Sequence, residues 1–483
     1  MMTTKKFRIK KITAILATLA ILMTFVSVVP VTVNASENPS DGYNFGKTES
    51  NSFDEGGGER CYKFSLETSG KVNFVLNAEI YHSTYQIYYG TIIKEEYLLW
   101  ENSGYADLSD GVLRLNETID LTSGNYTLCV SSDYKGKYSF SMNFTSAQES
   151  FKETENGSNN SFNTADTINL NTDYKAQIAL NDTVDYYKFV LDKSGRINFK
   201  LNSKLYYSSY EICDEDFNVI WKKSYYASVT TEILDIDENI DLVAGTYYLV
   251  LKGNYYDYDM NYVSKAYESR NTGALDFSVD YQKSNETFGE TQKSKNNSFE
   301  TAAVIDVNKD YTAQVALNDE IDYYKFTVQK GNSVNLIVST GLYHSSYAIY
   351  DENKNEIWQT SRYRGPETEI LELDKIIELT PGTYYFAIIS DYNGYDSDYI
   401  ASSYEYINTG DVKFRINAEV PIQVGDVNRD GSINIVDATL VQKYIVGLIY
   451  FNSDDIIIAD VTYDGYITVR DATTVQKMAI GIL

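Results

Sequence analysis

Two short stretches near the C-terminus place oxygen-bearing side chains at the spacing that calcium requires. In the first, positions 1, 3, 5, 7 and 12 of a twelve-residue loop hold Asp426, Asn428, Asp430, Ser432 and Asp437. Gly431 stands at position 6, where such a loop must turn sharply, and position 7 contributes its backbone carbonyl. Calcium takes roughly six to eight oxygen ligands, and this spacing wraps them around one point.

The same pattern recurs 34 residues later, where the corresponding positions hold Asp460, Thr462, Asp464, Tyr466 and Asp471. Thr462 takes the place of an amide or carboxylate, so we expect the second loop to bind calcium less tightly. Each loop runs into a segment with helical spacing of apolar residues. Two loops in phase, each before the same helical pattern, favour two calcium ions over a solvated acidic turn.

The other polar residues suggest no catalytic site. His82 and His344 occupy the same place in two repeats, and Tyr207 replaces them in a third, which is typical of a packing or sheet-surface position. Asp182 and Asp185 allow three interpretations: a glycosidase acid and base, a structural calcium site, or, most simply, turn-forming residues before a strand. We therefore predict no catalytic residue.

Aromatic residues are abundant, with 45 Tyr among 483 residues. Sugar rings stack on flat aromatic faces, so exposed tyrosines among polar residues predict a glycan surface. The candidates are Tyr206, Tyr207, Tyr210, Trp221, Tyr343, Tyr347 and Trp358. The alternative interpretation is that these side chains fill a core.

Most of the chain is built from three repeats. Asp185-Tyr-Tyr-Lys-Phe189 and Gly245-Thr-Tyr-Tyr248 recur exactly 137 residues later, and a looser copy comes earlier. Short alternating strands separated by turns predict a β-sandwich in each copy. We place the copies at residues 40–145, 158–282 and 295–418, and interpret residues 146–158 and 283–295 as short flexible linkers.

Charge and the N-terminus indicate where the protein works. Acidic residues outnumber basic ones 68 to 41, so nucleic acid and anionic membranes would be repelled. Residues 1–35 form a basic, then apolar stretch ending at Val33-Asn34-Ala35, which predicts a cleaved signal peptide and no membrane anchor afterwards. The cysteines are Cys61, Cys129 and Cys213; the first two can pair or remain buried thiols.

The repeats resemble the bacterial pre-peptidase C-terminal domain family. The resemblance lies in the Asn-Ser-Phe element near the start of each copy, the Asp-Tyr-Tyr-Lys-Phe strand and the late Gly-Thr-Tyr-Tyr element; copy 1 departs from it at Glu59-Arg-Cys-Tyr62. The resemblance implies a jelly-roll-like β-sandwich, mostly non-catalytic, in secreted proteins. Related modules bind polymers such as collagen or polysaccharide.

Residues 425–483 resemble a type I dockerin. The Asp-Ala-Thr and Val-Gln-Lys residues that occur in each half resemble those of dockerins from gut ruminococci. The resemblance implies two calcium ions and docking to a cohesin domain of a scaffoldin. The cohesin contacts that it implies are Ile435, Val436, Gln442 and Lys443 in the first half and Val469, Arg470, Gln476 and Lys477 in the second.

Together these features predict a mainly β chain of three tandem β-sandwiches followed by a small α-helical calcium-binding dockerin. We expect a secreted bacterial protein, extracellular or held at the cell surface through cohesin, in a cellulosome-like or amylosome-like complex. Its sandwiches would bind polysaccharide or a surface polymer. The alternatives are a polysaccharide-degrading enzyme that hydrolyses O-glycosyl bonds, or a structural spacer or adaptor.

Overall fold

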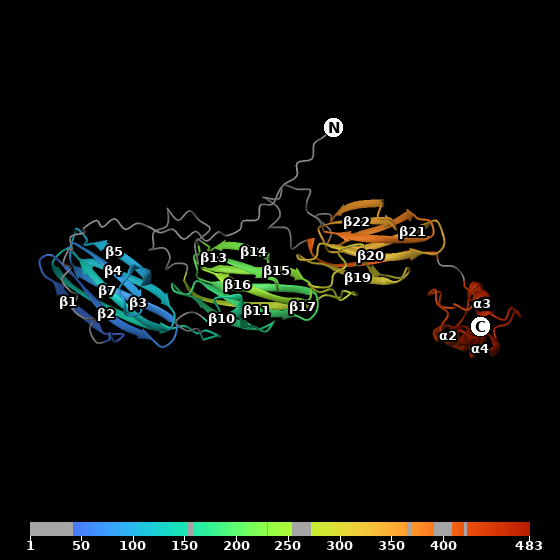
Figure 1. Cartoon of the computed structure of the whole chain (residues 1–483), viewed down its shortest axis with the longest axis horizontal. Coiled ribbons are helices and arrows are strands. Elements are labelled where there is room, and N and C mark those ends of the chain that lie inside the picture. The colour runs from blue at the N-terminus through green and yellow to red at the C-terminus, as the bar shows by residue number, and fades with distance from the viewer. Residues whose placement is uncertain are drawn as a thin grey trace, which may run out of the picture.

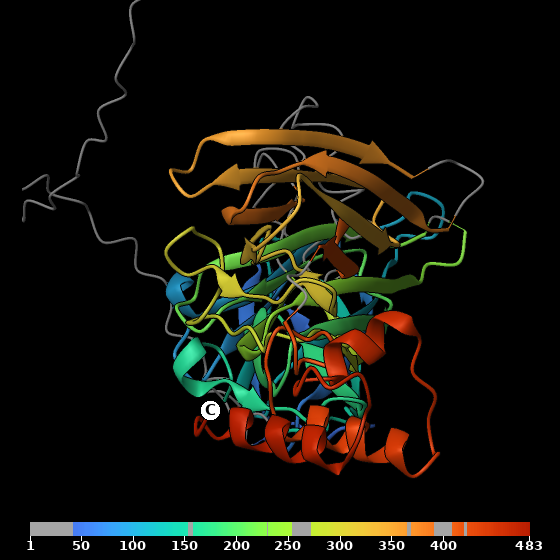
Figure 2. The same cartoon turned by 90° about the vertical axis from the view of Figure 1, so that its right-hand side faces the viewer.

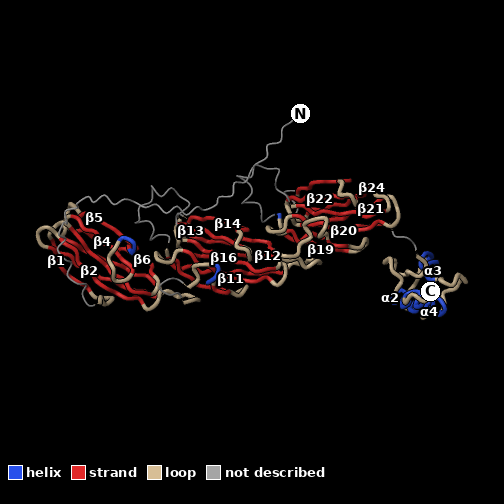
Figure 3. The backbone as a smooth tube through the Cα atoms, viewed as in Figure 1, coloured by secondary structure: helices blue, strands red, loops and turns tan. Residues whose placement is uncertain are grey.

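The computed structural model describes residues 42–152, 158–228, 230–253, 272–364, 369–390, 408–419 and 423–483. The predicted signal peptide at residues 1–35 lies outside them. The described chain is mainly β and ends in a small helical region, which confirms the predicted fold class (Figures 1 and 3). Its three β-sandwiches lie in a row, and Figure 2 looks along that row with the red helices nearest the viewer.

Sandwich 1 packs two four-stranded antiparallel sheets, ordered β1-β8-β3-β6 and β2-β7-β4-β5. Its elements are β1 (Thr48–Phe53), β2 (Gly58–Leu66), β3 (Gly70–Glu79), β4 (His82–Tyr89), η1 (Glu95–Tyr97), β5 (Leu98–Tyr105), β6 (Leu113–Leu121), β7 (Gly124–Ser132) and β8 (Gly136–Ser146). Alternate residues of each strand enter the core, as Val72, Phe74 and Leu76 do from β3.

Sandwich 2 has sheets ordered β10-β17-β12-β15 and β9-β11-β16-β13-β14. Its elements are η2 (Phe162–Thr164), β9 (Asp166–Thr167), β10 (Asp173–Ile178), β11 (Val184–Leu191), β12 (Gly195–Ser203), β13 (Tyr207–Cys213), β14 (Val219–Tyr226), β15 (Leu234–Leu242), β16 (Gly245–Lys252) and β17 (Gly273–Lys283). The short β9 pairs with β11 in parallel and widens this sheet relative to sandwich 1.

Sandwich 3 repeats this plan, with sheets β19-β26-β21-β24 and β18-β20-β25-β22-β23. Its strands are β18 (Ala303–Val304), β19 (Asp310–Val315), β20 (Ile321–Val328), β21 (Ser333–Thr340), β22 (His344–Asp351), β23 (Glu356–Tyr363), β24 (Leu371–Glu378), β25 (Gly382–Ile389) and β26 (Gly410–Ala418). The recurring sequence elements therefore occupy equivalent strands in the two sandwiches.

Each of the two segments that we predicted to be flexible linkers packs some of its residues against a sandwich. Phe151 stacks on Tyr174 in sandwich 2, and Phe288 stacks on Tyr311 in sandwich 3. Glu286 and Glu290 are buried. The linker prediction was wrong for these residues, because each segment is polar overall but carries one phenylalanine that packs against the sandwich core.

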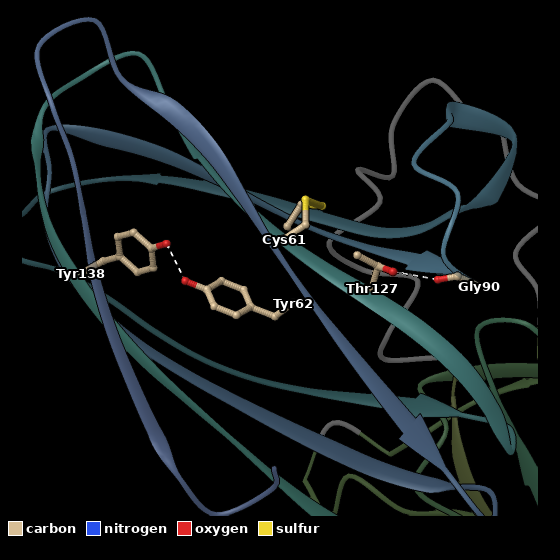
Figure 4. Close-up of a disulfide and its surroundings, with 6 residues drawn as sticks. Cys61, Tyr62, Gly90, Thr127 and Tyr138 are labelled. Carbon is tan, nitrogen blue, oxygen red and sulfur yellow. Dashed lines mark hydrogen bonds between the residues drawn. A yellow bond between two sulfur atoms is a disulfide. The ribbon is translucent and has the colours of Figure 1, made fainter. Parts of the chain in front are cut away.

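The structure settles the state of the cysteines. Cys61 and Cys129 are directly paired residues of β2 and β7 and form a disulfide, while Cys213 is a buried free thiol. Figure 4 shows the disulfide on one side of β2 and Tyr62 on the other, where its hydroxyl lies 2.8 Å from that of Tyr138. The disulfide belongs to the outer face of this sheet, where it packs with Tyr88.

In sandwiches 2 and 3 the same outer face is covered by the Asn-Ser-Phe element instead. Phe162 packs on Tyr186 and Tyr248, and Phe299 packs on Tyr323 and Tyr385. This cover explains why the element recurs in copies 2 and 3. The Asn51-Ser-Phe53 sequence of copy 1 is not its structural equivalent, because it belongs to β1 and Phe53 lies in the core of sandwich 1.

The C-terminal region contains α2 (Ile435–Ile445), α3 (Ser453–Ala459) and α4 (Val469–Ala479). Ala438 and Val441 of α2 meet Ala472 and Val475 of α4 in a small separate core. None of the helices in the described ranges is long and apolar enough to cross a membrane.

Candidate functional sites

The first acidic loop is closed by hydrogen bonds from its own backbone. The Asp426 carboxylate accepts from the amides of Asp430 (3.1 Å) and Gly431 (2.8 Å). Asp437 is buried at the start of α2 and accepts from the amides of Asn428 (3.0 Å) and Asn434 (2.8 Å). Gly431 has a φ of 87°, which a side chain would strain. These hydrogen bonds fix the carboxylates of Asp426 and Asp437 at the two ends of the loop.

The second loop has the same construction. Asp460 accepts from the amides of Asp464 (3.1 Å) and Gly465 (2.8 Å), and Asp471 accepts from the amides of Thr462 (3.1 Å) and Thr468 (2.9 Å). Ligand oxygens of Asp460, Asp464 and Asp471 all lie within 4.8 Å of one another. The Thr462 hydroxyl donates to Asp471 at 2.8 Å, so it faces a ligand of the same loop.

The helices that follow the loops present the predicted cohesin contacts. Ile435, Val436 and Val469 are more than half exposed, although they are apolar. Lys443, Arg470 and Lys477 are exposed, as is Gln442, and Gln476 is half-buried. Uncovered apolar residues at the start of each helix are typical of a protein-binding surface.

The predicted glycan residues divide sharply by burial. Tyr207, Tyr210, Trp221 and Tyr347 are buried, and Trp358 is half-buried against the core of sandwich 3. Tyr210, Trp221, Tyr347 and Trp358 pack in or against the sandwich cores, and Tyr207 lies on the opposite face of β13 from Tyr210, where it packs against Tyr226. Burial therefore leaves little of these rings for a polymer to stack on. Tyr206 is exposed and Tyr343 is half-buried, so these two remain candidates.

The structure instead gathers exposed aromatic rings at one place in every sandwich. In sandwich 1, the Tyr81 ring lies 5.5 Å from that of Tyr105 and 5.0 Å from that of Tyr134, edge to face. His82 lies 4.5 Å from Tyr105. Tyr81, Tyr105 and Tyr134 are 56%, 65% and 45% exposed. We call such a group the tyrosine cluster of its sandwich.

Sandwiches 2 and 3 carry tyrosine clusters at the equivalent strand ends. Tyr206 lies 5.9 Å from Tyr226, and Tyr343 lies 6.1 Å from Tyr363. The His344 ring stacks on that of Tyr363, with 4.2 Å between their centroids. The carbonyls of Tyr81, Tyr206 and Tyr343 each accept a backbone hydrogen bond, from Ala106, Ala227 and Arg364 respectively.

A second recurring site is a buried group of carboxylates. In sandwich 3, ligand oxygens of Glu290, Asp319 and Asp322 lie within 4.8 Å of one another, and all three side chains are buried. We call them the acid cluster. Asp319 lies against the side chains of Glu290 and Asn297, and Asn296 is buried beside the cluster, where its backbone amide donates to Glu290.

Burial makes negative charge costly in the acid cluster. It raises the pKa of Asp322 well above its ordinary value, and the neighbouring Glu290 and Asp319 carboxylates add to that shift. Burial, together with the carboxylates of Asp319 and Glu286, also raises the pKa of Glu290 to about 8. A divalent cation would neutralise this charge and take these closely spaced carboxylate oxygens as ligands.

The acid cluster varies among the sandwiches. Sandwich 2 has Asp182 and Asp185 at the positions of Asp319 and Asp322, and both are buried. Sandwich 1 has Gly57 and Arg60 at these positions. A guanidinium therefore replaces a carboxylate in the one sandwich that lacks the acidic pair. The sequence pointed to Asp182 and Asp185, but Glu290 was missed because it lay in a supposed linker.

Comparisons with known proteins agree with the helical region. Residues 424–478 match the dockerin type I domain, so the chain carries a type I dockerin at its C-terminal end. Type I dockerins generally bind calcium and dock to cohesins in extracellular cellulosome-like complexes. No curated protein matches the chain.

Among solved structures, the pre-peptidase C-terminal domain of a collagenase from Bacillus anthracis is similar at 17% identity, over 24% of this chain and 94% of that domain, with a TM-score of 0.17. Dimeric latent PorU from Porphyromonas gingivalis is similar at 9% identity, over 67% of this chain and 32% of that protein, with a TM-score of 0.13.

Proposed function

We propose that this protein is a secreted, non-catalytic subunit that binds a polymer through its tyrosine clusters and joins a cellulosome-like assembly through its dockerin. The dockerin implies the cohesin partner. The observation that supports the polymer role is the recurrence of mutually packed, exposed or partly exposed tyrosines at one place in all three sandwiches. Aromatic faces beside polar groups suit stacking against sugar rings.

The carboxylate positions favour binding over hydrolysis. Asp182 and Asp185 are at most 1% exposed, so a polysaccharide chain cannot reach them without opening the sandwich. A glycosidase needs its acid and its base or nucleophile on either side of an accessible glycosidic bond. The interpretation of this pair as catalytic therefore has no support in the described residues.

The test is a pull-down of the full chain with swollen cellulose, xylan and granular starch. Tyr81→Ala with Tyr105→Ala removes exposed rings only, so the fold should persist. We expect this double variant to lose at least about threefold in affinity if the rings stack on the polymer. The matched control is Ile376→Ala, an exposed apolar residue away from the clusters. No binding by the wild type to any of the three polymers would refute the polysaccharide role.

We further propose that the dockerin holds one calcium ion in each loop, through Asp426, Asn428, Asp430, Ser432 and Asp437 and through Asp460, Thr462, Asp464, Tyr466 and Asp471. The closed loop geometry supports this assignment. Calcium binding would supply much of the folding free energy of so small a core. We expect excess chelator to abolish cohesin binding; retained affinity in chelator would show that the loops are not the metal sites.

A second candidate role concerns the acid clusters. The burial of Glu290, Asp319 and Asp322 and the closeness of their carboxylate oxygens favour a structural divalent cation in sandwich 3, and the equivalent buried pair Asp182 and Asp185 extends the proposal to sandwich 2. Such a cation would stabilise the sandwiches and would not take part in polymer binding. Metal analysis of an Asp319→Asn variant, against the wild type after exhaustive dialysis, tests it: an unchanged stoichiometry would contradict the assignment.

A further inference from the structure

The contact between sandwiches 1 and 2 is specific and polar. The amide of Leu180 donates to the carbonyl of Asp120 at 3.0 Å, and the Leu180 side chain packs against the core of sandwich 1. The Asn181 side-chain amide donates to Thr122 at 2.6 Å. The buried Asp120 carboxylate accepts from the side-chain amide of Gln177 at 2.6 Å. Sandwich 2 thus supplies hydrogen-bond partners to polar groups of sandwich 1.

The contact between sandwiches 2 and 3 repeats this arrangement. The amide of Leu317 donates to the carbonyl of Asp241 at 3.0 Å, and Leu317 packs against the core of sandwich 2. The Asn318 side-chain amide donates to the Tyr247 hydroxyl at 3.0 Å. The buried Asp241 carboxylate accepts from the Thr409 hydroxyl at 2.7 Å and pairs with Arg196.

These junctions resist bending. Separating the sandwiches would remove Gln177 from Asp120 and Thr409 from Asp241, although Arg196 of sandwich 2 would still pair with Asp241. Losing these buried hydrogen bonds is costly unless water replaces them. The segments between sandwiches are also packed, as Phe151 and Phe288 show. Sandwiches 1 to 3 therefore form one rod, as Figure 1 shows.

The array also has distinct ends. At the positions of Leu180 and Asn181, sandwich 1 has Glu55 and Gly56. Sandwich 1 therefore lacks the Leu-Asn pair with which sandwiches 2 and 3 each contact the preceding sandwich. Glu378, which takes the position of Asp241, is exposed at the end of sandwich 3. The chain thus builds three sandwiches into a rod and does not offer matching ends for a filament.

The rod fixes the tyrosine clusters relative to one another. β5 and β14, which end in Tyr105 and Tyr226, lie on the upper side of the row in Figure 1, as does β22, which begins directly after Tyr343. In sandwich 3, the side chain of Asn408 accepts from the amide of His344 at 2.8 Å, and the next residue, Thr409, bonds Asp241 of sandwich 2. Junction and cluster are therefore held by one short segment.

We infer that the ligand is an extended polymer chain that runs along this side of the rod and contacts more than one tyrosine cluster at once. This inference rests on the proposed binding function. Rigid spacing raises the effective concentration of the second cluster only for a ligand long enough to span both clusters. A short oligomer would occupy one cluster and gain nothing from the junctions.

The test loosens one junction in the full chain. Leu317→Ser with Asn318→Ala removes the contacts with sandwich 2, and Glu378→Ala with Thr380→Ala at the open end of sandwich 3 is the matched control. Small-angle scattering measures rod stiffness. Binding is measured with swollen cellulose against cellohexaose, and with granular starch against maltohexaose.

We expect the loosened variant to show a broader distance distribution, unchanged hexaose affinity and about a tenfold loss in polymer affinity. The control should match the wild type in all three measurements. Unchanged polymer affinity in a variant that scattering shows to be loosened would overturn the inference. Scattering by the wild-type chain that fits flexibly linked domains, not a rigid rod, would also overturn it. A further variant removes all three clusters through Tyr81→Ala, Tyr105→Ala, Tyr206→Ala, Tyr226→Ala, Tyr343→Ala and Tyr363→Ala. If this variant no longer binds the hexaoses, but polymer affinity does not depend on rod stiffness, the clusters are binding sites and only the spanning of several clusters is rejected.

Discussion

Single residues decide which tyrosines are structural and which are free to bind. In each sandwich the tyrosine that ends the Tyr-x-Ser-x-Tyr run is buried and bonds a serine two residues before it, as Tyr347 bonds Ser345 at 2.6 Å. Burial raises the pKa of Tyr347 to about 12. The tyrosine that begins the run lies just before the strand and keeps part of its ring in solvent. Composition alone could not separate the two.

Removing hydroxyls tests this division. Tyr347→Phe removes a buried hydrogen bond and leaves Ser345 without its partner, so we expect a loss of about 1 kcal/mol in the free energy of unfolding of sandwich 3. Tyr343→Phe removes a hydroxyl near solvent and should change stability by less than about 0.5 kcal/mol. Hydrogen exchange of β22 measures both. Equal effects of the two substitutions would contradict the assignment.

The disulfide makes a second prediction for single residues. Cys61 and Cys129 are 68 residues apart in sequence, so their bond should stabilise sandwich 1 by about 2–4 kcal/mol through the unfolded chain. Replacing both by Ser should therefore speed exchange of β2 and β7. Cys213→Ala in sandwich 2 is the control and should leave these strands unchanged. The same exchange in both variants would show that the bond contributes no stability.

At the scale of elements, the sequence predicted strands, loops and helices well, because alternation and loop spacing are local properties. The sequence-based prediction failed for polar segments that are held in place by residues far away in the sequence. Residues 284–294 have the composition of a linker, yet Phe288 enters a core and Glu290 joins Asp319 and Asp322. The tyrosine clusters were missed in part for the same reason, since strand ends far apart in sequence bring Tyr81 and Tyr134 together.

The two dockerin units differ at one ligand position, which gives a prediction for the loop–helix element. Thr462→Asn supplies an amide oxygen where Thr462 offers a hydroxyl that donates to Asp471. We expect the second loop to bind calcium several-fold more tightly, because a carbonyl-type oxygen is the better ligand for this hard cation. Calorimetric titration of the full chain measures it. Asn428→Thr is the reciprocal variant, and it should weaken the first loop.

At the scale of the whole molecule, the three sandwiches serve as controls for one another. If the acid clusters hold cations, removal of metal should leave repelling buried carboxylates in sandwiches 2 and 3 and no such group in sandwich 1, where Arg60 stands in place of Asp322. Chelator should therefore speed hydrogen exchange in β11 and β20 and leave the equivalent β2 unchanged.

The same experiment follows the dockerin in the same chain. Exchange in α2 and α4 should rise to that of an unfolded segment in chelator and return when calcium is added. Exchange that rises only in α2 and α4 would restrict the metal to the dockerin and leave the buried acids as protonated pairs. Equal acceleration in β2, β11 and β20 would point to a general effect of chelator and would contradict the acid clusters as cation sites.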